Sequence, residues 1–201
     1  MPTPAEITRH HAVPADRDPF LPGQRSGPLE VDVVEPDPAW PAAYAEEAAA
    51  LRDLLGPVVL ELHHVGSTSV PGLPAKPVLD VDLVVADPAD EASYVPVLTA
   101  AGWVHRVREP WWHEHRLLQR REPRYVHLHV FGPDCPEVVR HLMFRDWLRE
   151  HADDRERYAA AKRAAGRATL ASGGSMLDYN AHKEPVVLEI YDRMFRHHGL
   201  L

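Results

Sequence analysis

Cysteine, positive charge and long apolar runs are scarce in this sequence, and each scarcity excludes a class of protein. Cys135 is the only cysteine, so the chain forms no internal disulfide and a reducing compartment is expected. The formal net charge of -8 argues against binding nucleic-acid phosphates or anionic lipid through clustered Lys and Arg. No apolar run approaches the roughly 20 residues that a membrane-spanning helix needs, and the N-terminus lacks the apolar core of a signal peptide. We therefore expect a cytoplasmic protein that has neither a membrane nor a nucleic acid as its partner.

The residues that are present have the composition of a globular domain with one unusual segment. Hydrophobic residues make up 45% and charged residues 26% of the 201 residues, so most of the chain should bury a core. Proline is abundant, at 20 residues, and six prolines fall within residues 1–28. That segment has few apolar side chains, so burial cannot offset its ordering entropy. We predict an irregular arm over residues 1–28 and one folded domain over residues 29–201.

Hydrophobic periodicity and turn residues predict the elements of that domain. Apolar residues three or four apart between Trp40 and Leu55 predict a helix with Asp37 as its cap and Pro38 at its first position. Runs of β-branched residues predict strands at 29–35, 58–65, 78–85, 103–107, 115–120 and 125–131, the last three antiparallel. Further helices are expected at 88–101, 136–150, 154–171 and 176–197. This order indicates an α/β (α+β) fold: a mixed sheet flanked by helices, with a helical C-terminal part.

Two acidic residues stand on one face of a strand that is otherwise apolar. Within residues 78–85, the two-residue period of a strand puts Asp80 and Asp82 on one face and the apolar side chains on the other. Adjacent carboxylates repel each other, and a divalent cation between them removes that cost. A solvated sheet face explains an isolated Asp-X-Asp pattern equally well, so the preceding loop bears on the choice.

The loop before that strand begins with small residues. Gly66 and Ser67 allow backbone N–H groups to approach phosphate oxygens, and Ser67 adds a hydroxyl donor. The loop is not a Walker A loop, because no Gly-Lys-Ser/Thr sequence follows Gly72. Lys76 lies between the loop and Asp80, where its charge can meet a phosphate, although a solvated lysine is expected equally often. A Gly-Ser pair by itself is more often a plain turn.

Gly66-Ser67 followed by the paired acids resembles the signature of the polymerase-beta-like nucleotidyltransferase superfamily, and residues 64–82 are similar to the defining stretch of the GrpB family. Further segments agree with that family: 35–41, 127–130, 141–149, Tyr158 with Lys162, and Tyr179 with Lys183. The resemblance covers about residues 30–197. It implies a nucleotidyltransferase-like fold in which the serine holds the triphosphate and the acids hold two Mg²⁺ ions for in-line attack on the α-phosphorus.

The resemblance also implies a set of site residues. Asp80, Asp82 and His129 are expected to be catalytic, with His129 standing where the superfamily has a third acid. The expected metal ligands are Asp80, Asp82, His127 and His129. The expected phosphate-binding residues are Gly66, Ser67, Thr68, Lys76, Arg145, Lys183 and, from the basic stretch 106–124, Arg116. Imidazole ligands favour Mn²⁺ or Zn²⁺ over Mg²⁺, so the expected cofactor is a divalent metal: Mg²⁺ or Mn²⁺, with Zn²⁺ as a further option. A hydrogen-bonded pair of sheet histidines is the alternative for His127 and His129.

Three functional hypotheses follow. The first is a metal-dependent nucleotidyltransferase-like enzyme that binds a nucleoside triphosphate and transfers a nucleotidyl group to an unidentified small molecule or protein. The second is a nucleotide-binding accessory module without turnover, in keeping with GrpB-like domains joined to dephospho-coenzyme A kinase. The third is a mononuclear metal hydrolase that uses Asp82, His127 and His129. The cluster at residues 111–115 has the residues to stack a base or bind metal, but its more common role is to form an edge of the core.

Overall fold

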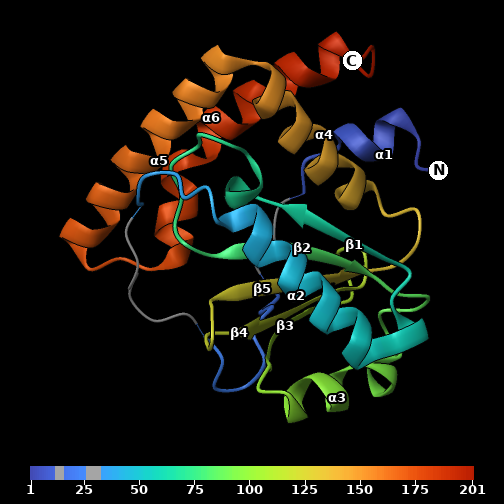
Figure 1. The fold of residues 1–201 in the computed structure, drawn as a ribbon. Coiled ribbons are helices and arrows are strands. Elements are labelled where there is room, and N and C mark those ends of the chain that lie inside the picture. Colours follow the sequence, from blue (N-terminus) through green and yellow to red (C-terminus); the bar gives the residue numbers. More distant parts are fainter. Residues whose placement is uncertain (12–15, 26–32) are drawn as a thin grey trace.

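The computed structural model describes residues 1–11, 16–25 and 33–201, and a five-stranded sheet lies at its centre (Figure 1). The strands are β1 (Glu61–Val65), β2 (Leu79–Val84), β3 (Val104–Glu109), β4 (His115–Arg120) and β5 (Val126–Phe131). Their order in the sheet is β1-β2-β5-β4-β3. β2 and β5 run parallel, whereas the other neighbouring pairs are antiparallel. The sheet is therefore mixed, as predicted.

Helices cover both faces of this sheet. They are α1 (Pro4–Thr8), α2 (Trp40–Leu55), α3 (Val95–Ala100), α4 (Pro136–Glu150), α5 (Ala152–Ser172) and α6 (Met176–His197). On one face, α2 and α3 pack on Val81, Leu83 and Leu128 in the largest buried cluster. On the other face, Val84 and Phe131 pack against α4. In Figure 1 the three C-terminal helices gather at one end of the molecule, which confirms the predicted helical C-terminal part.

Several predicted boundaries moved, each for a local reason. α2 begins at Trp40 instead of Pro38, because Asp37 accepts the N–H of Ala39 at 2.8 Å and holds that turn outside the helix. The strand predicted from residue 58 begins at Glu61, after a 3-10 turn at Gly56–Val58. The helix predicted over 88–101 is reduced to α3 and a separate 3-10 turn at Glu91–Ser93. Of the strand predicted at 29–35, residues 29–32 lie outside the described residues, and Val34 forms an isolated bridge with Ala75.

Of the irregular arm predicted over residues 1–28, residues 12–15 and 26–28 lie outside the described residues, and Pro4–Thr8 form a short helix. Thr3 and Glu6 form a capping box at the start of α1. Ile7 is buried in a cluster with α4, α5 and α6, and Arg140 of α4 donates a hydrogen bond to the carbonyl of Arg9 at 2.8 Å. The composition of the segment does not reveal these partners, because they lie more than a hundred residues further along the chain.

A second N-terminal stretch pairs with the edge of the sheet. Phe20 forms an antiparallel bridge with Val107 of β3. The N–H of Leu21 donates to the carbonyl of Arg106 at 2.9 Å, and the N–H of Arg108 donates to the carbonyl of Pro19 at 2.9 Å.

In the described part of the chain, none of the helices has both the length and the apolar content to cross a membrane.

Candidate functional site

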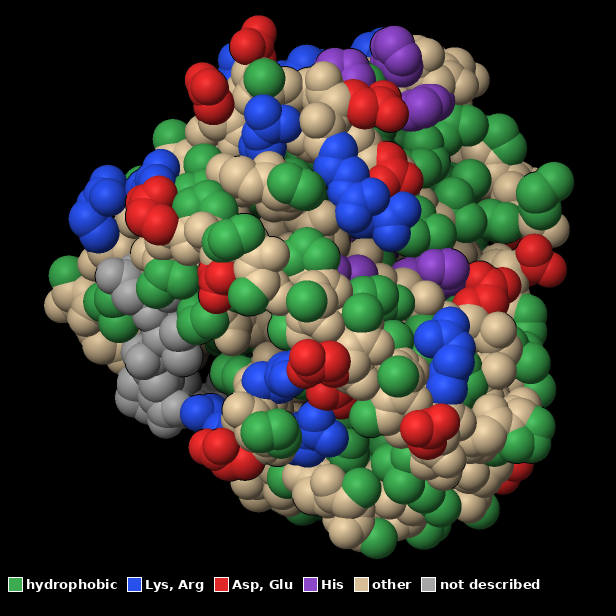
Figure 2. Space-filling model, in the orientation of Figure 1, with side chains coloured by type: hydrophobic (Ala, Val, Ile, Leu, Met, Phe, Trp, Pro, Cys, Tyr) green, Lys and Arg blue, Asp and Glu red, His purple; other side chains and the backbone are tan. Residues whose placement is uncertain are grey.

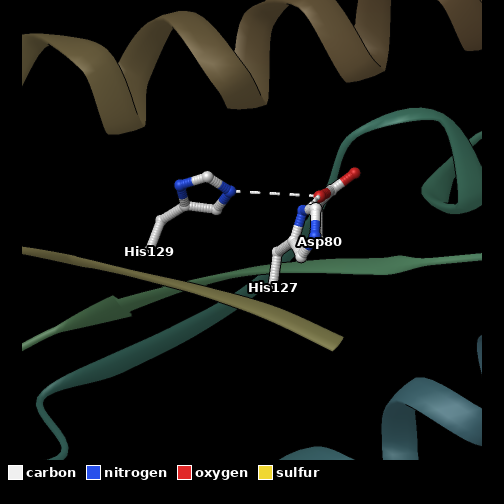
Figure 3. Close-up of side chains that lie close together, drawn as sticks. All are labelled: Asp80, His127 and His129. Carbon is white, nitrogen blue, oxygen red and sulfur yellow. Dashed lines mark ion pairs between the residues drawn. The ribbon is translucent and has the colours of Figure 1, made fainter. Parts of the chain in front are cut away.

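The parallel pairing of β2 with β5 brings one acid and two histidines together. Asp80 is the register partner of His127, and Asp82 is the partner of His129. Asp80 Oδ1 lies 3.2 Å from His127 Nδ1 and 3.9 Å from His129 Nε2. Figure 3 shows the His129 ring and the Asp80 carboxylate pointing toward each other. Burial alone would raise the pKa of Asp80, but the two neighbouring histidines lower it, so the carboxylate is ionised.

These three side chains have the spacing of ligands around a single ion. One ligand atom from each of Asp80, His127 and His129 lies within 4.8 Å of the other two. Ligand atoms at about 2.1 Å from a zinc ion, in a tetrahedral arrangement, lie about 3.4 Å apart. The observed 3.2 and 3.9 Å separations therefore need only small side-chain movements to close on one ion.

Asp82 was predicted to share this site, but the structure places it in a different set of contacts. Its side chain is fully buried, and Oδ2 accepts a hydrogen bond from His141 Nδ1 at 2.8 Å. His141 Nε2 lies 3.4 Å from Glu137 Oε1. Burial lowers the pKa of His141, but the two carboxylates outweigh it and raise that pKa well above the ordinary value. A protonated His141, which is 59 residues away in sequence, therefore offsets the charge of Asp82.

A cavity of about 430 Å³ opens over Asp80 and the histidines, a volume typical of small-ligand sites. Its walls include Gly66 and Ser67 from the loop after β1, Phe20 from the N-terminal stretch, and side chains of β4, α5 and α6. A neighbouring cavity of about 210 Å³ lies toward α4 and shares Ser67, Asp80 and Lys183 with the first. The candidate ligand group thus lies where the sheet, the Gly-Ser loop and the C-terminal helices meet.

Three lysines line the larger cavity: Lys76, Lys162 and Lys183. Burial lowers the pKa of Lys76 to about 8, and it lowers the pKa of Lys162 well below the ordinary value. Lys162 donates to the carbonyl of Pro74 at 2.6 Å, while Lys76 lies 4.1 Å from the ring centre of Tyr179. Within residues 1–11, 16–25 and 33–201, none of the three ammonium groups forms an ion pair with a carboxylate. An anion that entered the cavity would favour the charged forms of Lys76 and Lys162.

Two of the predicted phosphate-binding residues are used elsewhere. The hydroxyl of Thr68 is buried, donates to the carbonyl of Val78 at 3.1 Å and lies 3.1 Å from His64 Nε2. Arg116 points to the opposite face of the sheet, where its Nε donates to Glu91 Oε1 at 2.6 Å. Side chains alternate along β4, so the residues on either side of Arg116 face the cavity while Arg116 does not. Arg145 lines the smaller cavity and is paired with Asp146 at 2.8 Å.

Sequence reasoning missed the residues of β4 that contact the second ring nitrogens of the two histidines. His115 Nε2 lies 3.1 Å from His129 Nδ1, and Gln119 Nε2 lies 3.1 Å from His127 Nε2. The sequence places His115 in a cluster at an edge of the core. The two-residue period of 115–120 is a usable signal, since it puts His115 and Gln119 on the same face of that strand. The sequence singles out Lys162 only as a family position, without a place in the site.

Charge on the molecular surface is mixed. Figure 2 shows basic and acidic side chains interspersed among the residues drawn in colour, without a large basic patch on that face. This pattern is unlike the single-sign surfaces that hold nucleic-acid backbones. The positive groups of interest are instead the three lysines inside the cavity.

Comparisons with known proteins show which proteins this chain is similar to. UPF0157 protein BH1888 of Halalkalibacterium halodurans is 48% identical over 133 residues, which are 66% of this chain and 68% of that protein. The dephospho-CoA kinase of Mycolicibacterium paratuberculosis is 32% identical over 190 residues, covering 81% of this chain but 46% of that protein. The crystal structure of conserved protein GrpB from Enterococcus faecalis superposes with a TM-score of 0.70 and 27% identity, over 83% of this chain and 99% of that chain.

The family assignment rests on the greater part of the sequence. A family model described as GrpB protein matches residues 30–193. The matched segment contains all five strands and the Gly-Ser loop, and it ends within α6. The chain therefore belongs to the GrpB protein family.

Proposed function

We propose that this chain is a metal-dependent, nucleotidyltransferase-like protein that binds a nucleoside triphosphate in the larger cavity. The supporting observation is the presence of two features in one cavity: ligands for one divalent ion, and three lysines that have no carboxylate partner among the described residues. A metal–triphosphate complex would satisfy both, because the ligand group would hold the ion, which would supply charge compensation for phosphate oxygens, and the lysines would meet the remaining charge.

Asp80, His127 and His129 would hold the metal in this proposal. One carboxylate and two imidazoles form a mixed oxygen and nitrogen set, which favours Mn²⁺ or Zn²⁺ over Mg²⁺. When bound, the ion supplies charge compensation for phosphate oxygens and acidifies a bound hydroxyl. Asp82 would not bind the ion in this proposal. Its bond to His141 instead holds a protonated imidazole whose ring lies 6.2 Å from the ring of His129.

The phosphates would be bound by residues of the loop and the C-terminal helices. Ser67 offers a hydroxyl and a backbone N–H next to Asp80. Lys76 and Lys183 approach the same space from the loop and from α6, and both lie close to the ring of Tyr179. Their role is to offset the charge of the departing pyrophosphate, which is where charge develops during nucleotidyl transfer.

Calorimetric titration tests the metal and the nucleotide separately. We expect wild-type protein to bind Mn²⁺, and to bind ATP more tightly when Mn²⁺ is present. Asp80→Asn should weaken Mn²⁺ binding and abolish the effect of Mn²⁺ on ATP binding, because it removes the one carboxylate of the ligand group. Asp53→Asn, an exposed position on α2, is the matched control and should behave as wild type. Equal Mn²⁺ affinity in all three proteins would contradict the proposed site.

A nucleotide-binding accessory module is the second candidate. The observation that favours it is the match to nearly half of a dephospho-CoA kinase, in which the rest of the protein is available for the kinase reaction. Release of pyrophosphate from ATP, measured with candidate acceptors, separates the two proposals. An accessory module binds ATP and releases none. The mononuclear hydrolase with Asp82 as a ligand is less favoured, because the Asp82 side chain is fully buried and its Oδ2 is bonded to His141.

A further inference from the structure

We propose that β4 and the end of β3 set the tautomer of the candidate metal ligand His129, through a buried chain from Glu109 to His115 to His129. His115 and Glu109 are positioning residues in this proposal, and they do not touch the ion. The inference deepens the proposed function and rests on the metal site described above. It adds two positioning residues to the site and assigns different tautomer behaviour to the two histidine ligands.

With Glu109 ionised, the hydrogen bonds of this chain run in one direction. Glu109 Oε2 lies 2.7 Å from His115 Nδ1, and an ionised carboxylate only accepts, so Nδ1 of His115 carries a proton. A neutral His115 then has a lone pair on Nε2, which lies 3.1 Å from His129 Nδ1. His129 must donate from Nδ1, which leaves the lone pair on its Nε2. That is the atom that faces Asp80 Oδ1 at 3.9 Å, where an ion would be held.

The surroundings bury the chain and hold its geometry. His115 is 4% exposed and Glu109 is 8% exposed. The His115 ring stacks on Phe131, with 4.9 Å between ring centres, and meets the ring of Trp112 edge-on at 5.0 Å. A rigid, neutral imidazole between a carboxylate and a ligand is the arrangement that orients metal-binding histidines.

The second ligand, His127, has a different supporting group. Gln119 is its register partner on β4, and Gln119 Nε2 lies 3.1 Å from His127 Nε2. A side-chain amide can donate or accept, so Gln119 supports either tautomer of His127 by rotating. In the orientation described, His127 donates from Nδ1 to Asp80 Oδ1, 3.2 Å away. We infer that His129 is preset to bind an ion, whereas His127 changes tautomer when the ion arrives.

Long-range proton–nitrogen correlation spectra of protein with isotope-labelled histidine report which ring nitrogen carries the proton. In metal-free wild-type protein we expect His129 and His115 both to be protonated on Nδ1. His115→Phe retains the stacking on Phe131 but removes the acceptor, so His129 should become a mixture of tautomers. The Zn²⁺ affinity of the His115→Phe protein, measured with the metal alone, should be about tenfold to a hundredfold lower than that of wild type, the usual effect of losing such a supporting partner.

Glu109→Gln is a second variant that keeps the shape of the chain. Its amide no longer forces His115 to donate from Nδ1, so we expect the same tautomer mixture at His129 and weaker Zn²⁺ binding. Glu122→Gln, an exposed position on the turn after β4, should change neither. A residue that merely filled space would alter stability without moving the proton between the two nitrogens of His129.

Two results would overturn the inference. The first is a proton on Nε2 of His129 in metal-free wild-type protein, which would mean that Glu109 is protonated and the chain runs in reverse. The second is an unchanged His129 tautomer in both His115→Phe and Glu109→Gln. If wild-type protein binds no Zn²⁺, the proposed metal site fails, while the metal-free spectra still decide whether the Glu109–His115–His129 chain sets the tautomer.

Discussion

Glycine at position 66 lets the loop after β1 lie directly against the carboxylate of Asp80. Gly66 has a φ of +65°, and a Cβ at this position would collide with Asp80 Oδ2. Both the left-handed backbone and the close approach require a residue without a side chain. This contact places Ser67 beside the candidate ligand group, so the position of the loop and the position of the acid are not independent.

The effect of this contact can be measured against a second glycine in the same loop. Gly72 also has a positive φ, +76°, but a Cβ at that position would meet nothing within 4 Å. Gly66→Ala and Gly72→Ala should both incur a backbone cost of about 1–2 kcal/mol. Only Gly66→Ala should also displace Asp80, so we expect it to lower the unfolding free energy further and to weaken Mn²⁺ binding. Urea unfolding and calorimetry measure the two effects, and equal results for the two variants would argue against the contact.

At the scale of single elements, helix α5 buries a mostly polar stripe. Its buried residues recur every three or four positions: Asp154, Tyr158, Ala159, Lys162, Ala165, Gly166 and Thr169. Asp154 accepts a hydrogen bond from Trp147 at 2.8 Å and pairs with Arg193 of α6 at 2.6 Å, while Lys162 bonds to the loop before β2. On its buried face, the helix therefore presents charged groups to the cavity and to neighbouring helices. The buried face of a helix more commonly consists of apolar residues.

Replacement of Lys162 separates a structural role for this helix from a role in binding. Lys162→Met keeps the length of the side chain and removes the ammonium group, so we expect ATP affinity to fall about tenfold, the equivalent of about 1.4 kcal/mol. The unfolding free energy should change by about 1 kcal/mol or less, because the lost contacts are one hydrogen bond to Pro74 and a contact with the ring of Tyr158. Arg163→Met, next in sequence but paired with exposed Glu35, is the control. A similar loss of ATP affinity in both variants would show that net charge, not the cavity, is responsible.

The elements that the sequence predicted best are those with strong local patterns. The bounds of α4, α6 and β4 coincide with the predicted ranges, because apolar spacing and turn residues alone specify them. Contacts between distant segments were beyond that reasoning. α1 depends on α4, and Asp82 depends on His141, so neither outcome is encoded within a short window of sequence. The face of Arg116 was within reach of the strand period, yet its partner Glu91 was not.

Across the whole molecule, the protonation of buried histidines makes the free energy of unfolding depend on pH. Burial is the main cause that lowers the pKa of six histidines: His10, His64, His105, His113, His115 and His127. The unfolded chain protonates these groups near the ordinary value of about 6.5, whereas the folded protein keeps them neutral to lower pH. Their stabilising contribution is thus present above about pH 6.5 and lost as the pH falls. His141 has the opposite sign, since its raised pKa adds stability below about 6.5 that is lost at higher pH.

For His64, the size of this pH-dependent change in unfolding free energy can be estimated. Burial against Tyr44 and Thr68 lowers the pKa of His64 to about 4, so its contribution is lost between about pH 6.5 and pH 4. In urea unfolding we expect the free energy of wild-type protein to fall between about pH 7 and about pH 5. In His64→Gln that fall should be smaller by about 2 kcal/mol, the value that this pKa difference gives over the interval. His182→Gln, on an exposed part of α6, is the control; the same pH dependence in all three proteins would contradict the assignment.

The pairing of residues 19–21 with β3 affects how the sheet meets other chains. β3 is the last strand in the sheet order, and an open edge strand offers unpaired N–H and C=O groups to which another polypeptide can add. Here the carbonyl of Arg106 and the N–H of Arg108 are already bonded to Leu21 and Pro19 of the same molecule. The N-terminal stretch that lines the cavity with Phe20 thereby also covers part of this edge, so one short segment contributes both to the wall of the site and to protection of the sheet edge.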